Sequence, residues 1–339
     1  MLEAFRCDTD EDRRLLLKQA RSIAMWALPQ YGLDWTTISY IGLSDNITYK
    51  IETASSGSYL LRMHGRWMSY AEIQSELMLL QALNRVEGLT MPEGVANTAG
   101  TYILKADSAE DPSSLWVTVT RWVEGEHAGA HMTDQRMFDM GAMMGALHIA
   151  AAGFAPPAGF IRPVWGEQSF KCEMDKLGRY YSGFVSETGW KTYQLAAAKI
   201  LSELEGMEAN EDQYGLIHGD LHSGNVVFAG EQPYPIDFGR CGYGYYLYDL
   251  AAALLELSPG QRKRFIEGYA SRKKLESGYV RRLECFFIMI MIANYSHHAS
   301  NPAEVPGLRE QQPYSQAYLR EYLKSAPFLF EVIEPEEVE

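Results

Sequence analysis

The pattern of apolar and polar residues has two different periodicities along the chain. Residues 10–31 have acidic residues at their start and apolar positions at helical spacing, which predicts an amphipathic helix with Leu15, Leu16, Ile23 and Trp26 on its apolar face. From residue 34 the pattern changes to short runs rich in β-branched and aromatic residues, separated by turn-forming residues. These runs predict an antiparallel meander of three strands, Trp35–Ile41, Ile47–Thr53 and Ser58–Met63.

A second helix is predicted directly after this meander. Ser69 and Glu72 have the spacing of a capping box, and apolar residues then recur at helical intervals. At about 100° per residue, Glu76 falls within the apolar stripe of this helix. A carboxylate on the buried side of a helix needs a cationic partner, and Arg62 on the third strand is the candidate. The alternative is that Glu76 lies only at the rim of the apolar face.

The rest of the chain is mostly helical. Two further strands are predicted over 101–106 and 115–123, and three short ones over 215–217, 226–228 and 234–236. Helical patterns cover 133–151, 167–187, 190–208, 247–257, 259–273, 278–298 and 313–325. We therefore expect an α+β fold with two lobes and a cleft between them. The expected parts are an N-terminal helical extension (1–33), a β-sheet lobe (34–123), a helical lobe (124–330) and an acidic tail (331–339).

Composition excludes several classes of protein. The chain has 339 residues with 30 Lys and Arg against 44 Asp and Glu, so its net charge of −14 argues against a nucleic-acid partner. The longest clean apolar run, Cys285–Ala293, is far shorter than the roughly 20 residues of a membrane-spanning helix. No signal peptide is visible, and the four cysteines form no C-x-x-C pair. These features favour a cytoplasmic protein, and the acidity slightly favours a cationic substrate.

One segment carries most of the candidate chemistry. Apolar strands flank a loop with Asp220 and, five residues later, Asn225, and a second hairpin arm then brings Asp237 before Phe238-Gly239. Phosphoryl transfer from a nucleotide needs a carboxylate that accepts the proton of the acceptor hydroxyl, together with hard oxygen ligands for Mg²⁺. The spacing matches the H-x-D-x-x-x-x-N and D-F-G motifs of the protein-kinase-like fold. The alternative is a turn whose His and Asp only cap local backbone.

The groups that a nucleotide needs occur in the expected chain order. The turn between the first two strands contains a single glycine, so the side chains of Ser44 and Asn46 would add to backbone amides in cradling phosphates. Arg62 occupies the third-strand position of the cation that contacts the α- and β-phosphates, and Glu76 is its natural anchor. Val119 to Trp122 precede the connector whose backbone would bind the adenine edge. The alternative for the turn with Ser44 and Asn46 is an ordinary hairpin turn without a nucleotide contact.

The chain resembles the aminoglycoside phosphotransferase family, which includes choline kinase-like and type II homoserine kinase-like enzymes. Three motifs carry the resemblance: H-G-D-L-H-x-x-N from His218, I-D-F-G from Ile236 and Y-D-L-A from Tyr248. The similar region spans roughly residues 35–300. These motifs are specific for a bilobal protein-kinase-like fold and for the reaction, but they do not identify the substrate.

The resemblance also implies roles for individual residues. It makes Asp220 the catalytic base and makes Asn225 and Asp237 the ligands of Mg²⁺. Arg62 would contact phosphate, as an arginine does in choline kinase-like members, whereas many aminoglycoside kinases have lysine there. Asp249, at the start of a predicted helix, would tie the catalytic loop down.

A small molecule is the expected phosphate acceptor. A helix is predicted near Leu247, only eight residues after Gly239, and no A-P-E motif follows, so there is no room for a platform that holds a peptide. We expect transfer from ATP, with GTP as the alternative, to a hydroxyl of a small molecule such as an aminoglycoside. The alternatives are a metabolic kinase for a choline-, homoserine- or sugar-like compound and a non-catalytic nucleotide-binding scaffold. Four tyrosines either line the acceptor pocket or are structural: Tyr243, Tyr245, Tyr246 and Tyr248. No motif encodes the acceptor or the oligomeric state.

Overall fold

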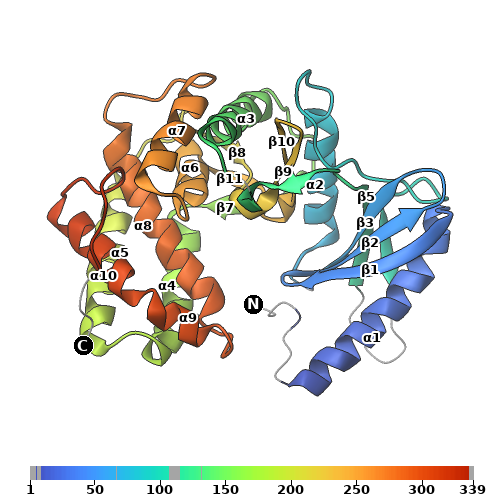
Figure 1. Ribbon diagram of the computed structural model, residues 1–339, viewed down its shortest axis with the longest axis horizontal. Helices are drawn as coiled ribbons and strands as arrows, with labels where there is room; N and C mark the ends of the chain where they lie inside the picture. The colour runs from blue at the N-terminus through green and yellow to red at the C-terminus, as the bar shows by residue number, and fades with distance from the viewer. Residues whose placement is uncertain (1–4, 6–8, 66, 107–114, 131, 336–339) are drawn as a thin grey trace. The chain divides into compact units, whose positions relative to one another are not determined.

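The computed structural model describes residues 5, 9–65, 67–106, 115–130 and 132–335 (Figure 1). The chain divides into two units. Unit 1 comprises Met1–Glu124 and Phe154–Arg162, and unit 2 comprises Gly125–Gly153 and Pro163–Glu339. The α+β class predicted from the sequence is confirmed. The predicted boundaries differ at 154–162, which the sequence pattern assigned to the helical lobe but which belongs to unit 1.

Unit 1 is built on one antiparallel sheet with the strand order β1-β2-β3-β5-β4. The predicted meander is present, and its first strand extends two residues further than expected, so that the turn before the second strand contains only Ser44 and Asp45. The strands are β1 (Trp35–Leu43), β2 (Asn46–Thr53), β3 (Ser58–His64), β4 (Ile103–Ala106) and β5 (Leu115–Arg121).

The two faces of this sheet have different chemistry. Because side chains alternate along a strand, β3 and β5 place one set of residues in an apolar core: Leu61, Met63, Val117 and Val119. The residues between them are polar but equally buried: Arg62, His64, Thr118 and Thr120. A buried polar face must satisfy its hydrogen-bonding groups internally, and His64 Nε2 accordingly lies 2.9 Å from Thr118 Oγ1. One face of the sheet of unit 1 therefore forms the apolar core, and the other carries buried polar side chains that could take part in binding or catalysis.

Helix α1 (Asp10–Ala27) and the short 3₁₀ helix η1 (Leu28–Tyr31) contribute to the apolar core. The predicted apolar face of α1 is wrong in part, because Leu15 and Trp26 are 54% and 47% exposed. The buried side is formed by small residues, Ala20, Ala24 and Ala27. Small side chains let the helix axis approach the core closely. If the large side chains of Leu15 and Trp26 faced the core instead, they would keep the helix further from it. Helix α1 and η1 are thus part of the core of unit 1.

Helix α2 (Tyr70–Leu83) begins as predicted. Ser69 is the N-cap, and the reciprocal hydrogen bonds of a capping box join it to Glu72. These bonds satisfy amide groups that a helix start leaves without partners, and so fix where the helix begins.

Unit 2 is mainly helical. Its α-helices are α3 (Asp134–Ala152), α4 (Glu167–Tyr180), α5 (Glu187–Glu205), α6 (Tyr246–Leu254), α7 (Pro259–Ala270), α8 (Tyr279–His298), α9 (Val305–Glu310) and α10 (Gln312–Lys324). Short 3₁₀ helices are η2 (Ala128–Ala130), η3 (Tyr181–Gly183), η4 (Ser223–Asn225) and η5 (Phe238–Arg240). The sequence predicted all of the α-helices except α9, which is a single short stretch.

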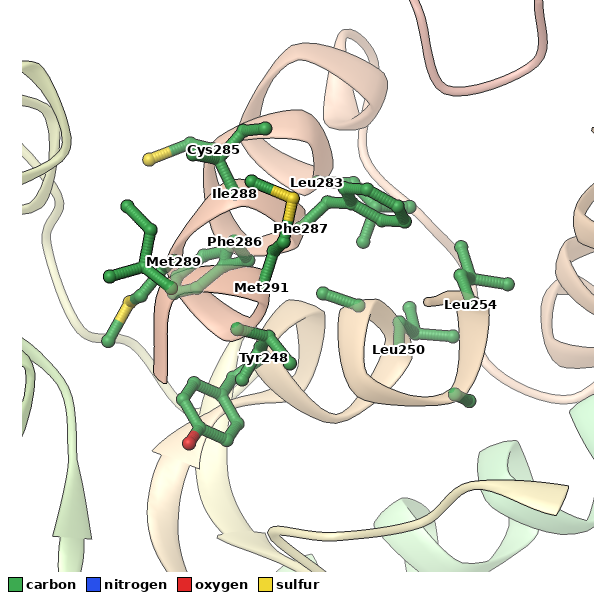
Figure 2. Close-up of a cluster of buried hydrophobic side chains, with 14 of the residues drawn as sticks. Tyr248, Leu250, Leu254, Leu283, Cys285, Phe286, Phe287, Ile288, Met289 and Met291 are labelled. Atoms are coloured by element: carbon green, nitrogen blue, oxygen red, sulfur yellow. The ribbon is translucent and has the colours of Figure 1, made fainter. Parts of the chain in front are cut away.

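Two contacts define the centre of unit 2. Helices α6 and α8 pack through apolar side chains, among them Leu250, Leu254, Phe286 and Phe287 (Figure 2). Helices α3 and α7 instead cross at glycines, where a Cβ at Gly268 would overlap the carbonyl oxygen of Phe138. One contact is therefore set by side-chain packing and the other by backbone against backbone.

Two small sheets complete unit 2, with strand orders β10-β9-β6 and β7-β11-β8. The strands are β6 (Glu126–His127), β7 (Val164–Trp165), β8 (Tyr214–Ile217), β9 (Val226–Ala229), β10 (Gln232–Pro235) and β11 (Gly242–Tyr245). The unpredicted ones, β6, β7 and β11, have only two to four residues. Of the acidic tail, residues 331–335 have no helix or strand, and 336–339 lie outside the described residues. Within the described part of the chain, every helix is too short or too polar to cross a membrane.

Candidate active site

The predicted partner of Glu76 is present in unit 1. Arg62 Nη1 lies 2.9 Å from Glu76 Oε1, and both side chains are almost fully buried. Arg62 reaches this position because it lies on the polar face of β3, and Glu76 because the capped start of α2 fixes the rotation of the helix. Glu76 is only 2% exposed, so the alternative that it lies at the rim of the apolar face is excluded.

A second arginine near Glu76 has no sequence motif. Arg162 Nη1 donates a hydrogen bond of 2.9 Å to the carbonyl oxygen of Glu72 and lies 4.0 Å from Glu76 Oε2. Its side chain is buried. Nothing in the sequence pointed to it, because it comes from a segment without helical or strand periodicity, far along the chain from α2.

The other predicted nucleotide contacts are engaged within unit 1. The exposed Ser44 donates its backbone N–H to the carbonyl oxygen of Asn46. Asn46 Oδ1 in turn accepts a bond of 3.3 Å from the N–H of Gly65. The N–H of Trp122 donates to Ser58. Asn46 thus braces the ends of β2 and β3, and Trp122 extends the pairing of β3, while their contact with a nucleotide stays a prediction.

The loop after β8 in unit 2 carries the predicted base, Asp220. Gly219, just before it, has φ +80°, and a Cβ there would overlap the carbonyl oxygen of Arg240 and crowd the indole nitrogen of Trp165. Only glycine fits this position without strain. At the other end of the loop, Asn225 Nδ2 donates a bond of 2.9 Å to the backbone oxygen of Asp220. The loop is therefore closed on itself by a bond to the backbone of Asp220.

The β9–β10 hairpin brings the predicted metal ligands together. Ile236 N–H donates to the Asn225 carbonyl oxygen at 2.9 Å, so that Asn225 lies opposite the residue before Asp237. His218 Nε2–H donates to the Ile236 carbonyl oxygen at 2.9 Å and ties this arm to the catalytic loop. Asp237 has φ +59°, a left-handed conformation that a non-glycine residue adopts at a cost. Such a conformation re-aims a side chain at the point where the strand ends.

Burial and neighbouring charges have opposite effects on the pKa of Asp220. Burial raises the pKa of the Asp220 carboxyl, whereas the guanidinium of Arg240 and the imidazole of His222 act to lower it. Arg240 is itself held over the ring of Trp165, with 4.7 Å between its guanidinium carbon and the ring centroid. Its carbonyl oxygen accepts a bond of 2.9 Å from Trp165 Nε1. The sequence did not identify Arg240 or Trp165 as neighbours of the catalytic loop.

Asp249 anchors the loop that carries Asp220, as predicted. Its two oxygens accept the backbone N–H groups of His218 and Gly219, each at 2.7 Å. His148 lies 3.0 Å from the same carboxylate and 2.9 Å from the hydroxyl of Tyr269. Burial would raise the pKa of Asp249, but hydrogen bonding with His148 and His218 holds that pKa below its usual range. Burial lowers the pKa of His148, so the neutral imidazole donates from Nε2 and accepts at Nδ1.

The donor set of unit 2 fits a magnesium ion. The amide nitrogen of Asn225 is used within the loop, so its oxygen is the atom suited to a cation, and Asp237 supplies a carboxylate. Within the described residues there is no cluster of three or more His, Cys, Asp or Glu side chains that could hold a metal alone. Mg²⁺ at nucleotide sites needs no such cage, because phosphate and water complete its shell of six oxygens.

The tyrosines of the predicted acceptor region divide into two groups. Tyr246 and Tyr248 are buried on α6, whereas Tyr243 and Tyr245 are half-buried on β11. The ring of Tyr248 stacks against that of Trp165 with 6.0 Å between centroids. Figure 2 shows its hydroxyl turned away from the labelled apolar side chains. Tyr248 is therefore part of the core through its ring, while its hydroxyl leaves the cluster.

Comparison with known proteins identifies the family of the chain. The model of the phosphotransferase enzyme family matches residues 37–284. The chain belongs to this family and has a kinase-like fold. Kinases of this family use ATP together with a divalent metal ion.

Its curated relatives include enzymes that act on different small molecules. An uncharacterised protein of Synechocystis is 28% identical over 68% of this chain and 63% of its own length. The chain thus spans less than two thirds of that relative. Amicoumacin kinase of Bacillus subtilis is 23% identical over 73% of this chain and 70% of its own length. Homoserine kinase of Neisseria meningitidis is 26% identical over 71% of this chain and 76% of its own length.

Solved structures show the same fold. A microcompartment-associated aminopropanol kinase has a TM-score of 0.77 and 25% identity, covering 91% of this chain and 99% of its own. An amicoumacin kinase solved with AMP-PNP, Ca²⁺ and its antibiotic has a TM-score of 0.73 and 16% identity, with coverages of 91% and 96%. At 16% identity, the similarity to the amicoumacin kinase structure concerns the fold alone.

Proposed function

We propose that this protein transfers the terminal phosphoryl group of ATP to a hydroxyl of a small molecule that also carries an amine. GTP is the alternative donor. The observation that carries the proposal is the closed loop of unit 2. The Asn225 side chain bonds the backbone of Asp220, and the Asn225 carbonyl oxygen accepts a bond from Ile236, the residue before Asp237. A base and two hard oxygen ligands on one braced element are what phosphoryl transfer to an alcohol requires.

Each residue then has a defined task. Asp220 accepts a hydrogen bond from the acceptor hydroxyl, orients its oxygen toward the phosphorus and takes its proton as the new P–O bond forms. Asn225 and Asp237 hold Mg²⁺, which when bound neutralises charge on the phosphates. Arg62 contacts the phosphates, and Glu76 keeps its guanidinium in place. Catalysis of this kind rests on positioning and charge neutralisation.

A non-catalytic nucleotide-binding scaffold is the rival from another class. Such a protein has use for metal ligands but none for a base, so the intact Asp220 in its braced loop disfavours it. The free cysteines among the described residues, Cys172, Cys241 and Cys285, support the predicted cytoplasmic location, where ATP is available.

The acceptor class follows from shared chemistry. Aminopropanol and homoserine, after which two of the similar kinases are named, each carry a hydroxyl and an amine. A net charge of −14 favours a cationic compound of this kind. The antibiotic alternative rests on the amicoumacin kinases, and a sugar without an amine has no comparable support.

Release of ADP across a panel of acceptors tests the proposal. The panel contains amino alcohols, homoserine, ketoamines, aminoglycosides, amicoumacin and neutral sugars, each with Mg²⁺-ATP. We expect turnover with an amine-bearing acceptor and a loss of roughly 10²–10⁴-fold in the Asp220→Ala variant, the usual contribution of a general base. Calorimetry should show nucleotide binding retained in Asp220→Ala but weakened in Asp237→Ala. Full activity of Asp220→Ala would contradict the assignment of the base.

A further inference from the structure

We propose that Arg162 is a positioning residue that fixes helix α2, so that Glu76 holds Arg62 in the orientation needed for the nucleotide phosphates. This inference rests on the proposed role of Arg62. It concerns unit 1 alone and a residue for which the sequence and the family motifs give no signal.

The segment Phe154–Arg162, which we call the strap, belongs to unit 1 although α3 before it belongs to unit 2. The rings of Phe154 and Phe160 meet edge to face, with 5.3 Å between their centroids. Their contact folds the strap back on itself before its last two residues reach α2. The strap thus has internal structure that presents Ile161 and Arg162.

Two hydrogen bonds join the end of the strap to one side of α2. The N–H of Ile161 donates a bond of 2.9 Å to Ser75 Oγ, and that hydroxyl donates to the carbonyl oxygen of Ala71 at 2.7 Å. Arg162 Nη1 donates to the Glu72 carbonyl oxygen at 2.9 Å. Residues three and four apart lie on the same side of a helix. The strap therefore contacts α2 along one side, at Glu72 and Ser75.

The same side of α2 includes Glu76, whose two carboxylate oxygens face different arginines. Oε1 lies 2.9 Å from Arg62 Nη1, and Oε2 lies 4.0 Å from Arg162 Nη1. All three side chains are buried, where charges interact more strongly than in water. A carboxylate held from both sides cannot rotate without weakening one of its pairs, so Arg162 restricts the rotation that would release Arg62.

The surroundings of the two arginines agree with this view. His64 lies two residues after Arg62 on the same face of β3, and burial, reinforced by Arg62 and Arg162, lowers its pKa well below 6.5. His64 is therefore neutral and does not compete for Glu76. Arginine suits position 162 because its planar fork can bond a carbonyl oxygen and face a carboxylate at once, whereas lysine offers one point charge.

The contacts have a consequence for activation. In protein kinases the ion pair between the third strand and the following helix must be in place for activity, and movement of that helix is a means of control. Here the strap braces the helix with hydrogen bonds to its side chain and backbone. We infer that the Arg62–Glu76 pair is assembled before the nucleotide arrives and needs no activating step.

Kinetics of three arginine variants test the inference. In Arg162→Gln we expect the KM for ATP to rise about tenfold or more, the effect of losing a charged, buried hydrogen bond, while the KM for the acceptor stays within about twofold. Arg162→Lys should recover part of the loss. The matched control is Arg121→Gln, because Arg121 pairs with Glu93 at the exposed surface of the same unit, and it should leave both constants unchanged. Equal changes in both KM values, or none, would overturn the inference.

A double-mutant cycle shows whether Arg162 acts through Glu76. If it does, Arg162→Gln adds less than about twofold to the ATP KM of the Glu76→Gln variant, whereas multiplicative effects contradict the inference. Should Arg162→Gln fail to fold, Ser75→Ala removes the acceptor for Ile161 together with a local bond to the Ala71 carbonyl oxygen, and the ATP KM should still rise. Arg62→Gln separates the two proposals. An unchanged ATP KM there refutes the role of Arg62, whereas a raised value beside a neutral Arg162→Gln refutes the inference alone.

Discussion

The two units hold their functional residues by different physical means. In unit 1, Arg62 is oriented by ion pairs between side chains of separate elements, β3, α2 and the strap. In unit 2, the loop that carries Asp220 is held through its backbone, with the Asp249 carboxylate accepting two consecutive amides. The difference corresponds to the proposed tasks. Contact with phosphates needs a charge in the right place, whereas a base must be aimed within fractions of an ångström.

The contrast predicts different sensitivities to substitution. Replacing a residue of the side-chain network in unit 1 changes the position of a charge while the strands and helices persist. Replacing the anchor in unit 2 removes the acceptor of two buried backbone amides, and a buried amide without a partner is costly. Four measurements test this contrast, from the largest expected effect to the smallest.

The Asp249→Asn variant should show the largest effect. The new amide group would turn one donor toward a backbone N–H of His218 or Gly219, leaving a buried donor without an acceptor. We expect the free energy of unfolding to fall by about 3–5 kcal/mol, as when one partner of a buried charged network is removed, together with loss of turnover. Urea denaturation measures the first quantity, and ADP release the second. Asp139→Asn on α3, whose carboxylate accepts an exposed hydrogen bond from Gln135, is the control and should change stability by less than about 0.5 kcal/mol.

Substitution of Gly219 separates loop shape from side-chain chemistry. Alanine at this position meets both a left-handed backbone and the carbonyl oxygen of Arg240. Gly230, in the turn between β9 and β10, has φ +64° with no atom near its missing Cβ. Gly230→Ala should therefore cost only the conformational strain of about 1 kcal/mol, whereas Gly219→Ala should cost at least about 2 kcal/mol more and reduce kcat. Equal losses in the two variants would show that the close approach at Gly219 is unimportant.

Acid should weaken both units in the same direction. Burial lowers the pKa of His64 and of His148, so each stays neutral in the native protein while its unfolded form takes up a proton below about pH 6.5. The free energy of unfolding therefore falls as the pH drops below 6.5, by up to about 1.4 kcal/mol per pH unit for each histidine. In His64→Gln the slope between pH 6.5 and 5 should lose the contribution of one histidine. An unchanged slope would mean that His64 is charged in the native state.

The Arg62→Lys variant should show the smallest effect. Lysine retains the charge opposite Glu76 but loses the fork, so we expect the ATP KM to rise by about tenfold at most and stability to change by about 1 kcal/mol or less. A loss comparable to that of Asp249→Asn would mean that unit 1 depends on exact side-chain geometry as strongly as unit 2. Steady-state kinetics and thermal unfolding of the same preparation provide the comparison.

Sequence patterns predicted what local rules control. The capping box of α2, the meander and the Arg62–Glu76 pair follow from spacing within about 20 residues of one another. The catalytic loop and its anchor Asp249 were found through motifs with fixed spacing. For most of the α-helices of unit 2, existence and order were correct, and only their ends shifted.

What the sequence did not predict depends on long-range contact. The most deeply buried residues of α1 are alanines, beside the partly buried Leu16 and Ile23, and a pattern search favours large residues such as Leu15 and Trp26. Strands β6, β7 and β11 are too short to show a period and exist because neighbours pair with them. Arg162 and Trp165 reach the functional residues only through the folded path of the chain after α3, so no local pattern could identify them.

The glycine crossing of α3 and α7 has a consequence for the accuracy of the catalytic loop. His148 lies on α3 two turns after Gly141, and Tyr269 follows Gly268 on α7, so the hydrogen bond between them spans that crossing. A methyl group at either glycine would separate the helices, and the displacement would pass through His148 to Asp249 and from there to the amides of the loop. Gly141 and Gly268, which carry no functional group, therefore determine how accurately the loop positions Asp220.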